Sequence, residues 1–290
     1  MQHFNYIFFA GAETPYETAR YVVFGVPYDG TCSFLPGTRR GPQEIRRYTW
    51  NFEDYLPEYD LDFWTLPVCD LGDIEPDSLP ETVVSQVEEI VTEIAADGKI
   101  PVLLGGEHSV SVGAVRALKP EAVVVCDAHL DLRDEFGGTP YNHACATRCF
   151  YDDGVRDITI IGARSGTREE FSFARDHLTL YTAEDVRKQG ITAILEEVTK
   201  RLEGKKVYLS IDADAIDCCL TPGLGTPEPF GLTPLDIRAV VQKVGPFVIG
   251  FDYMEVCPID HGQAATVAGK LIMEFLAVHA TSHNITNSLE

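Results

Sequence analysis

Short apolar runs alternate with amphipathic patterns along almost the whole chain. The runs are mostly β-branched or apolar throughout and lack polar alternation, which is typical of strands buried on both faces of a sheet. The predicted strands are Tyr21–Phe24, Trp64–Cys69, Ile100–Leu104, Ala122–Cys126, Ile158–Ile161, Leu178–Tyr181, Val207–Ile211 and Val248–Phe251.

Helical patterns fill the intervals between these runs. Apolar residues recur with a period near 3.6 in four segments, and Thr233 before Pro234 is typical of an N-cap followed by a favourable first helical residue. The predicted helices are Leu79–Asp97, Ile191–Leu202, Pro234–Val244 and Gln263–His279. Repeated strand–helix units predict an α/β fold with a mostly parallel sheet between two helical layers. Without a linker or repeat, we expect one domain over residues 1–280 and a flexible tail over residues 281–290.

The composition of the chain indicates which classes of partner the protein is expected to bind. The chain has 290 residues and a net charge of −22, because it contains 45 Asp and Glu residues and 23 Lys and Arg residues. This charge disfavours nucleic acid and favours cationic ligands, although solubility or adaptation to a salty cytoplasm explains most of the acids equally well. No basic signal region and no uninterrupted apolar run near ~18 residues are present. We therefore expect a cytoplasmic protein with no membrane partner.

Eight cysteines are present, and none forms a CxxC pair. Several lie in apolar runs, so reduced and mostly buried thiols are expected rather than a zinc ribbon or a disulfide framework. We interpret the neighbouring Cys218 and Cys219 as structural, because such a pair is a poor chelate.

Polar residues follow four of the predicted strands. The segments are GGEHS at 105–109, DAHLD at 127–131, DADAID at 212–217 and DYME at 252–255. Parallel sheets bind ligands beyond the carboxyl ends of their strands, so this edge is the predicted site.

Side chains alternate along extended backbone, which predicts that the acids and the histidine of DAHLD face one cavity. The carboxylates of Asp127, Asp131, Asp212 and Asp214 would then share one semi-buried edge, which costs roughly several kcal/mol for each unpaired charge. One divalent ion would leave two charges unbalanced, whereas two ions balance all four. His108 and His129 add neutral nitrogen ligands, and oxygen-rich ligation with imidazole favours Mn²⁺. Asp217 and Asp252 are interpreted as supporting groups in loops or behind the ligands.

Two metal ions activate water and polarise a substrate, so hydrolysis is the expected chemistry. Phosphoryl transfer by a metallophosphatase is an alternative, weakly supported by Gly105–Gly106 and Arg133. Glu255 favours hydrolysis of a cationic substrate, because it adds a carboxylate that the metals do not require.

The segments at 105–109 and 127–131, together with SIDADAIDCCLTPGLGTPEP at 210–229, closely resemble the ureohydrolase family, which includes arginase and agmatinase. GVPYDGTCSFLPGTRRGP at 25–42 and DYMEVCP at 252–258 are similar to that family as well. The resemblance spans nearly the whole chain. It implies a single three-layer αβα domain with a mostly parallel eight-stranded sheet, assembled as a homo-oligomer, either a trimer or a hexamer.

The resemblance also implies two Mn²⁺ ions per subunit and a role for each site residue. One ion would be held by His108, Asp127, Asp131 and Asp212, and the other by His129, Asp127, Asp212 and Asp214. A hydroxide bridging the metals and oriented by Asp131 would attack the guanidinium carbon. Glu255 would pair with the guanidinium, and His143 would shuttle protons with an ordinary pKa near ~6.5. Glu107, Cys218 and Phe230 depart from common family residues without removing a ligand.

The segment after Asp131 bears on the choice of substrate. DAHLDLRDE resembles agmatinases of archaeal type, which implies hydrolysis of agmatine to putrescine and urea, with Asp134 or Glu135 meeting the distal ammonium. Arg133 stands where arginase-type sites carry an asparagine and can itself pair with a carboxylate. Arginine and guanidinobutyrate therefore stay open as substrates, as does an inactive metal-binding relative.

Overall fold

A central sheet of eight strands organises the protein, and the computed structural model describes residues 7–285. The strand order is β4-β1-β5-β10-β9-β6-β7-β8, and every neighbouring pair is parallel. The strands are β1 (Tyr21–Val26), β4 (Val68–Asp73), β5 (Ile100–Gly105), β6 (Ala122–Cys126), β7 (Asp157–Ala163), β8 (Thr179–Thr182), β9 (Val207–Asp212) and β10 (Val248–Met254). The predicted α/β fold with a mostly parallel eight-stranded sheet is confirmed.

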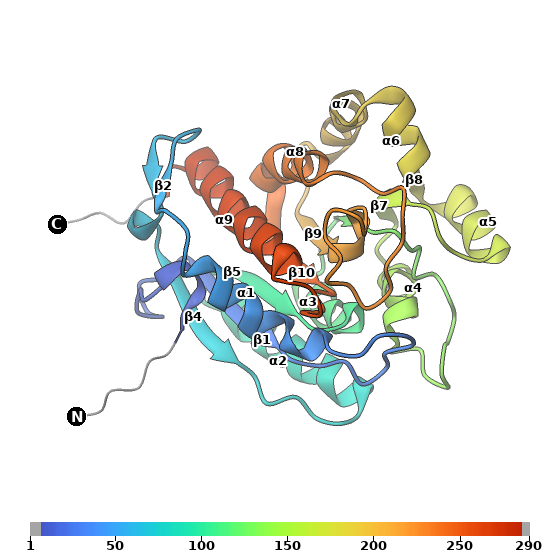
Figure 1. Ribbon diagram of the computed structural model, residues 1–290, viewed down its shortest axis with the longest axis horizontal. Coiled ribbons are helices and arrows are strands. Elements are labelled where there is room, and N and C mark those ends of the chain that lie inside the picture. The colour runs from blue at the N-terminus through green and yellow to red at the C-terminus, as the bar shows by residue number, and fades with distance from the viewer. Residues whose placement is uncertain (1–6, 286–290) are drawn as a thin grey trace.

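Helices lie on both faces of this sheet (Figure 1). They pack against it through two separate apolar cores. One core includes residues of α1 (Gly41–Thr49), α6 (Ala183–Gln189), α7 (Ile191–Leu202), α8 (Pro234–Val244) and α9 (Gln263–His283). The other includes residues of α2 (Pro80–Ala96), α3 (Ser111–Leu118), α4 (Ala146–Asp152) and α5 (Arg168–His177). A small antiparallel pair, β2 (Tyr55–Leu56) and β3 (Leu61–Asp62), lies apart from the main sheet.

Most predicted boundaries are close to the observed ones. Helices α7 and α8 have the predicted bounds, and Thr233 caps α8 in a reciprocal hydrogen-bonded arrangement with Asp236. The strand predicted at Trp64–Cys69 instead runs over Val68–Asp73, because a 3₁₀ turn occupies Phe63–Thr65. The tail predicted from residue 281 begins too early, because α9 continues to His283. Residues 286–290 of that tail lie outside the described residues.

Helix α9 is long and apolar enough to cross a membrane, yet 78% of its most apolar window is buried inside the protein. Phe275 of α9 stacks on Phe251 of β10 with ring centroids 4.5 Å apart. Glu274 interrupts the apolar sequence, and its carboxylate is buried and accepts hydrogen bonds from Tyr59 Oη at 2.5 Å and Gln242 Nε2 at 2.6 Å. The apolar composition of α9 is therefore explained by its place in the core.

All eight cysteines are free thiols, as expected from their spacing. Five are buried, Cys218 is half-buried, and Cys32 and Cys219 are exposed. Ligand atoms of Asp217, Cys218 and Cys219 lie within 4.8 Å of one another. The Asp217 carboxylate already accepts hydrogen bonds from the backbone N–H groups of Cys219 and Gly231, so it stabilises the conformation of this loop.

The strand order explains how distant segments reach one site. Strands β5, β10, β9 and β6 are consecutive neighbours in the sheet. Their carboxyl ends therefore bring together the polar segments that follow them, as the sequence pattern predicted.

Candidate active site

The DAHLD segment converges on the site by bending. Strand β6 ends at Cys126, and Asp127 Oδ1 accepts a hydrogen bond from the backbone N–H of His129 at 2.6 Å. Asp131 adopts a left-handed backbone with φ +50°. The expectation that alternation along extended backbone aligns these side chains is therefore wrong, although the convergence itself is observed.

The segment after β9 bends in the same way. Ala213–Ala215 form a 3₁₀ turn, and the backbone N–H of Asp214 donates to Asp212 Oδ1 at 2.9 Å. Both carboxylates are buried. The turn lets the side chains of two residues that are two apart in the sequence converge on the site without extended geometry.

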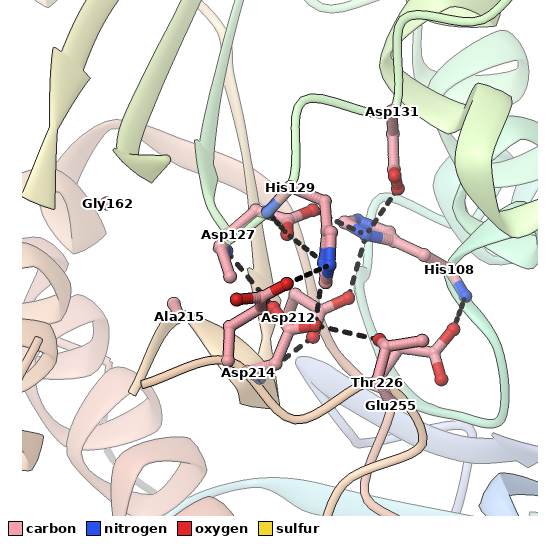
Figure 2. A network of polar contacts seen from close by, with 12 residues as sticks. His108, Asp127, His129, Asp131, Gly162, Asp212, Asp214, Ala215, Thr226 and Glu255 are labelled. Atoms are coloured by element: carbon pink, nitrogen blue, oxygen red, sulfur yellow. Dashed lines mark hydrogen bonds and ion pairs between the residues drawn. The ribbon is translucent and has the colours of Figure 1, made fainter. Parts of the chain in front are cut away.

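His108 lies at the centre of a first cluster of possible metal ligands (Figure 2). Its Nδ1 lies 3.2 Å from Asp127 Oδ2, 3.2 Å from Asp212 Oδ2 and 3.5 Å from Asp131 Oδ2. In the described part of the chain, His108 Nδ1 and Asp127 Oδ2 are buried without a hydrogen-bond partner. Ligands at ~2.1 Å from an octahedral ion lie roughly 3 Å from each other, so this spacing fits a shared cation.

A second cluster surrounds His129. Its Nδ1 lies 2.9 Å from Asp214 Oδ2 and 3.7 Å from Asp127 Oδ1. Thr226 Oγ1 donates to Asp214 Oδ2 at 3.1 Å, and the backbone N–H of Ala128 donates to Asp214 Oδ1 at 3.1 Å. Asp127 belongs to both clusters. The structure thus brings all six predicted ligands together around two adjacent centres.

The buried carboxylates of this site repel one another, and the site lacks the positive charge that would balance them. Burial, and then the carboxylates of Asp214 and Asp127, raise the pKa of Asp212 well above its usual range. Burial, and then Asp127, do the same to the pKa of Asp131. Burial disfavours a charged His129, but the carboxylates of Asp214 and Asp127 outweigh it and raise the pKa of the imidazole. Two divalent ions would relieve this excess of negative charge, so the donor set fits a pair of metal ions.

A buried hydrogen-bonded chain supports His108 from behind. Ser210 Oγ lies 2.8 Å from His108 Nε2 and donates to Asp252 Oδ1 at 2.6 Å. Tyr208 Oη donates to Asp252 Oδ2 at 2.6 Å. Ser210 donates its hydroxyl proton in a hydrogen bond to Asp252, so its oxygen accepts a hydrogen bond from the Nε2–H group of His108. This arrangement leaves the Nδ1 lone pair of His108 free for a metal. Asp252 is thus a supporting group, as expected.

A cavity of about 220 Å³ opens over these clusters. Of the predicted site residues, seven line it and His108 and Asp127 lie buried behind its wall. The lining residues are Ser33, His129, Asp131, Arg133, Phe136, His143, Ala144, Ser165, Asp212, Asp214, Thr226 and Glu255.

Glu255 lines the cavity from the end of β10. Its backbone is left-handed with φ +61°, a strained conformation for a glutamate that recurs at functional sites. Its Oε1 accepts a hydrogen bond from the backbone N–H of His108 at 2.8 Å. Burial, and then Asp212 and Glu107, raise the pKa of this carboxyl, so a cation beside it would be strongly favoured.

His143 also lines the cavity, within a short turn capped by Asn142. Its Nδ1 lies 3.1 Å from Thr31 Oγ1, and its Nε2 lies 3.1 Å from Ser33 Oγ. Burial, and then the charge at His129, lower the pKa of His143 to about 4. The expectation of an ordinary pKa near ~6.5 is therefore wrong, and the ring is neutral at pH 7.

The structure separates Arg133 from its two acidic neighbours. The Arg133 guanidinium lies 4.4 Å from the Phe136 ring centroid, and its Nε lies 3.8 Å from Glu170 Oε2. Asp134 and Glu135 are exposed and do not line the cavity, and Asp134 forms an ion pair with Arg148. The expectation that Asp134 or Glu135 meets a distal ammonium in the cavity has no support in this arrangement, because both side chains lie outside it.

Several lining residues were not singled out from the sequence. Ser33, Phe136, Ser165 and Thr226 lie in irregular loops, where periodicity carries no signal. Ser33 and Thr226 lie within the family-like segments at 25–42 and 210–229, which was their only signal in the sequence. Phe136 and Ser165 carried no such signal.

The fold and the paired clusters are those of the arginase family, and the sequence model of that family matches residues 19–278. The chain belongs to the arginase family and is a hydrolase that acts on guanidino compounds.

Individual relatives cover nearly the whole chain. The N(1)-aminopropylagmatine ureohydrolase of Thermococcus kodakarensis is 41% identical over 263 residues, which are 88% of this chain and 89% of the relative. The agmatinase of Pyrococcus horikoshii is 38% identical over 91% of this chain and 93% of its own. The crystal structure of the agmatine ureohydrolase of Thermoplasma volcanium superposes with a TM-score of 0.91 at 41% identity, covering 97% of both chains.

Proposed function

We propose that the protein hydrolyses agmatine to putrescine and urea with two Mn²⁺ ions. The observation that carries this proposal is the position of Glu255, a buried carboxylate that lines the cavity beside both clusters and belongs to neither. A guanidinium is a planar cation with several donors, and a buried carboxylate is its natural partner.

The ligand residues divide between two ions. His108, Asp127, Asp131 and Asp212 would hold one ion, and His129, Asp127, Asp212 and Asp214 would hold the other, so that Asp127 and Asp212 would contribute to both. When bound, such a pair of ions lowers the pKa of a water molecule and polarises the substrate. The excess of carboxylate oxygen over nitrogen, and the lack of thiolate, favour Mn²⁺ over zinc.

Residues of the chain hold the reacting groups in place. Glu255 binds the guanidinium and turns its carbon toward the clusters. Asp131 accepts a hydrogen bond from the attacking water. Hydrolysis must move two protons from this water to the departing nitrogen, and His143 is a neutral base on the cavity wall that can carry one.

Two features of the site support agmatine as the substrate. The cavity of about 220 Å³ is below the ~300–1,000 Å³ of sites for drug-sized ligands, which favours a short chain. Its acidic wall attracts a dication. Two observations favour other guanidino substrates: Arg133 could bind the carboxylate of guanidinobutyrate or arginine, and the Thermococcus kodakarensis relative is named for aminopropylagmatine.

A urea-release panel tests the proposal. Mn²⁺-loaded protein is given agmatine, N(1)-aminopropylagmatine, guanidinobutyrate and arginine at equal concentrations, and a phosphate ester serves as the control for phosphatase activity. We expect the highest kcat/KM for agmatine. A higher value for another guanidine would reject the substrate, and the absence of urea from all four would reject turnover.

We also propose a cytoplasmic location and a trimeric or hexameric assembly. The eight free thiols fit a reducing compartment. Light scattering on the purified chain checks the assembly, and a monomer would reject it.

A further inference from the structure

We propose that Thr31 and Glu107 are positioning residues that determine which ring nitrogen of His143 carries its proton. The inference rests on the proposed function, because it specifies how His143 works in that reaction. Thr31 lies in the loop after β1, Glu107 lies just beyond β5, and His143 begins the turn before α4. Three distant segments therefore meet at one hydroxyl.

The Thr31 hydroxyl has one proton, and it points away from His143. Thr31 Oγ1 donates to Glu107 Oε1 at 2.7 Å, and the Thr31 backbone N–H donates to Glu107 Oε2 at 2.8 Å. Ser109 Oγ also donates to Glu107 Oε1, at 2.5 Å. Glu107 is 1% exposed and receives three donors, so it acts as an acceptor for Thr31. The lone pairs of Thr31 Oγ1 then remain for other donors.

His143 supplies those donors. Its backbone N–H donates to Thr31 Oγ1 at 3.1 Å, and its ring Nδ1 lies 3.1 Å from the same oxygen. An oxygen without a proton to give can only accept, so Nδ1 carries the ring proton. In a neutral imidazole the other nitrogen, Nε2, then has a free lone pair.

The free lone pair of Nε2 lies beside a residue of the cavity wall. Nε2 lies 3.1 Å from the hydroxyl of Ser33, which lines the cavity, and the Phe136 ring packs edge-on against the imidazole with centroids 6.4 Å apart. A proton leaving the attacking water can bind at Nε2 while Nδ1–H keeps its bond to Thr31. The same Nε2–H can then give that proton to the departing nitrogen. The ring need not rotate between the two transfers.

Ring ¹⁵N chemical shifts measure the tautomer directly. Protein with ¹⁵N-labelled histidine is loaded with diamagnetic Zn²⁺, and the His143 signals are assigned by their loss in His143→Asn. We expect the Nδ1–H form in the wild type and in Thr31→Ser, which keeps the hydroxyl. We expect Thr31→Val to lose that form in favour of a mixture or the Nε2–H form. An Nε2–H wild type, or an unchanged tautomer in Thr31→Val, would overturn the proposal.

Kinetics provide the second readout. With the Mn²⁺ enzyme, Thr31→Val is expected to lower kcat at least ~10-fold with KM changed less than ~3-fold, and Thr31→Ser to restore most of kcat. The exposed helix residue Thr92 supplies the matched control, Thr92→Val, with kcat unchanged. Equal kcat in Thr31→Val and the wild type would overturn the proposal. Should Thr31→Val not fold, Thr31→Ala removes the same hydroxyl with less bulk.

A substitution of Glu107 tests the same hydrogen bond independently, although this residue is next to the proposed metal ligand His108 in the sequence. Glu107→Gln keeps the shape but offers one donor in place of an acceptor, and we expect it to shift the tautomer in the same direction as Thr31→Val. Because Glu107 precedes His108, metal content is measured in each sample. The tautomer is read without substrate, so a protein that releases no urea would reject the proposed function and still report on Thr31 and His143.

Discussion

The hydroxyl of Ser210 lies 2.8 Å from Nε2 of His108, and neither group is exposed to solvent. This contact sets the His108 tautomer that leaves Nδ1 available to a metal. Groups that support a metal ligand from behind typically contribute about 10–100-fold to metal affinity.

We therefore expect Ser210→Ala to weaken Mn²⁺ binding by about 10–100-fold, or roughly 1.4–2.7 kcal/mol. Isothermal titration of metal-free protein measures the loss. Ser85→Ala on the exposed face of α2 is the matched control. Equal affinity in the two variants would show that Ser210 does not orient His108.

Metal removal is expected to destabilise the fold, because the buried carboxylates then repel one another. Each ion present at ~100 times its Kd stabilises the folded state by about 2.7 kcal/mol. Two ions should raise Tm by roughly 10 °C or more in a chain of this size. Thermal melts with EDTA, and again after Mn²⁺ is restored, check this. A Tm that stays constant through both steps would contradict a two-metal centre.

Burial explains why the sheet could be predicted from the sequence. Strands with both faces covered, such as Ala122–Cys126, are apolar at every position, and their ends are marked by the first charged residue. Short helices such as Ser111–Leu118 and Ala146–Asp152 were missed, because each contains only about two turns and too few apolar repeats to show a period.

The ligands could be predicted from the sequence, whereas several residues of the cavity wall could not, for a physical reason. Carboxylates that follow buried strands are costly without a cation, so Asp127 and Asp212 stand out in the sequence. The direction of a side chain in an irregular loop depends on backbone angles that the sequence pattern does not encode. Arg133 faces the cavity and its neighbour Asp134 faces solvent, a difference that follows from these backbone angles and not from the sequence pattern.

Removal of the Glu255 charge should weaken transition-state binding more than folding. Glu255→Gln keeps the size of the side chain at a backbone φ of +61° but loses the charge that we propose pairs with the guanidinium. Truncating one partner of a buried charge pair costs about 2–5 kcal/mol, so kcat/KM should fall at least ~30-fold. Urea release measures the fall. Glu93→Gln on the exposed surface is the control, and a fall of less than threefold in Glu255→Gln would reject the proposed contact.

Arg133 should discriminate between substrate tails. Among the described residues 7–285, it is the one cationic side chain other than the histidines in the cavity lining, so it repels a distal ammonium and attracts a distal carboxylate. We expect Arg133→Met to raise the ratio of kcat/KM for agmatine to that for guanidinobutyrate by about 10-fold. Arg148→Met, which removes an arginine outside the cavity, should leave the ratio unchanged. A ratio that falls in Arg133→Met would place the substrate tail elsewhere.

His279 should make stability depend on pH far from the metal centre. Its Nδ1 lies 2.9 Å from Tyr21 Oη in the core of α9 and β1. Burial, and then His283 and Arg20, lower the pKa of His279 to about 3, whereas an unfolded histidine titrates near ~6.5. Between these values the unfolded chain binds the proton more strongly. The contribution is therefore complete above pH ~6.5 and is lost as the pH falls toward 3.

For one such group, lowering the pH from 7.5 to 5.5 should cost about 1.4 kcal/mol of unfolding free energy. Urea denaturation in EDTA at these two pH values, both above the sequence pI of about 4.6, measures the loss. His279→Gln keeps a polar partner for Tyr21 but cannot titrate, so its loss should be smaller by about that amount. His283→Gln, one helical turn away and exposed, should keep most of the wild-type dependence. Equal losses in His279→Gln and the wild type would mean that His279 can be protonated without unfolding.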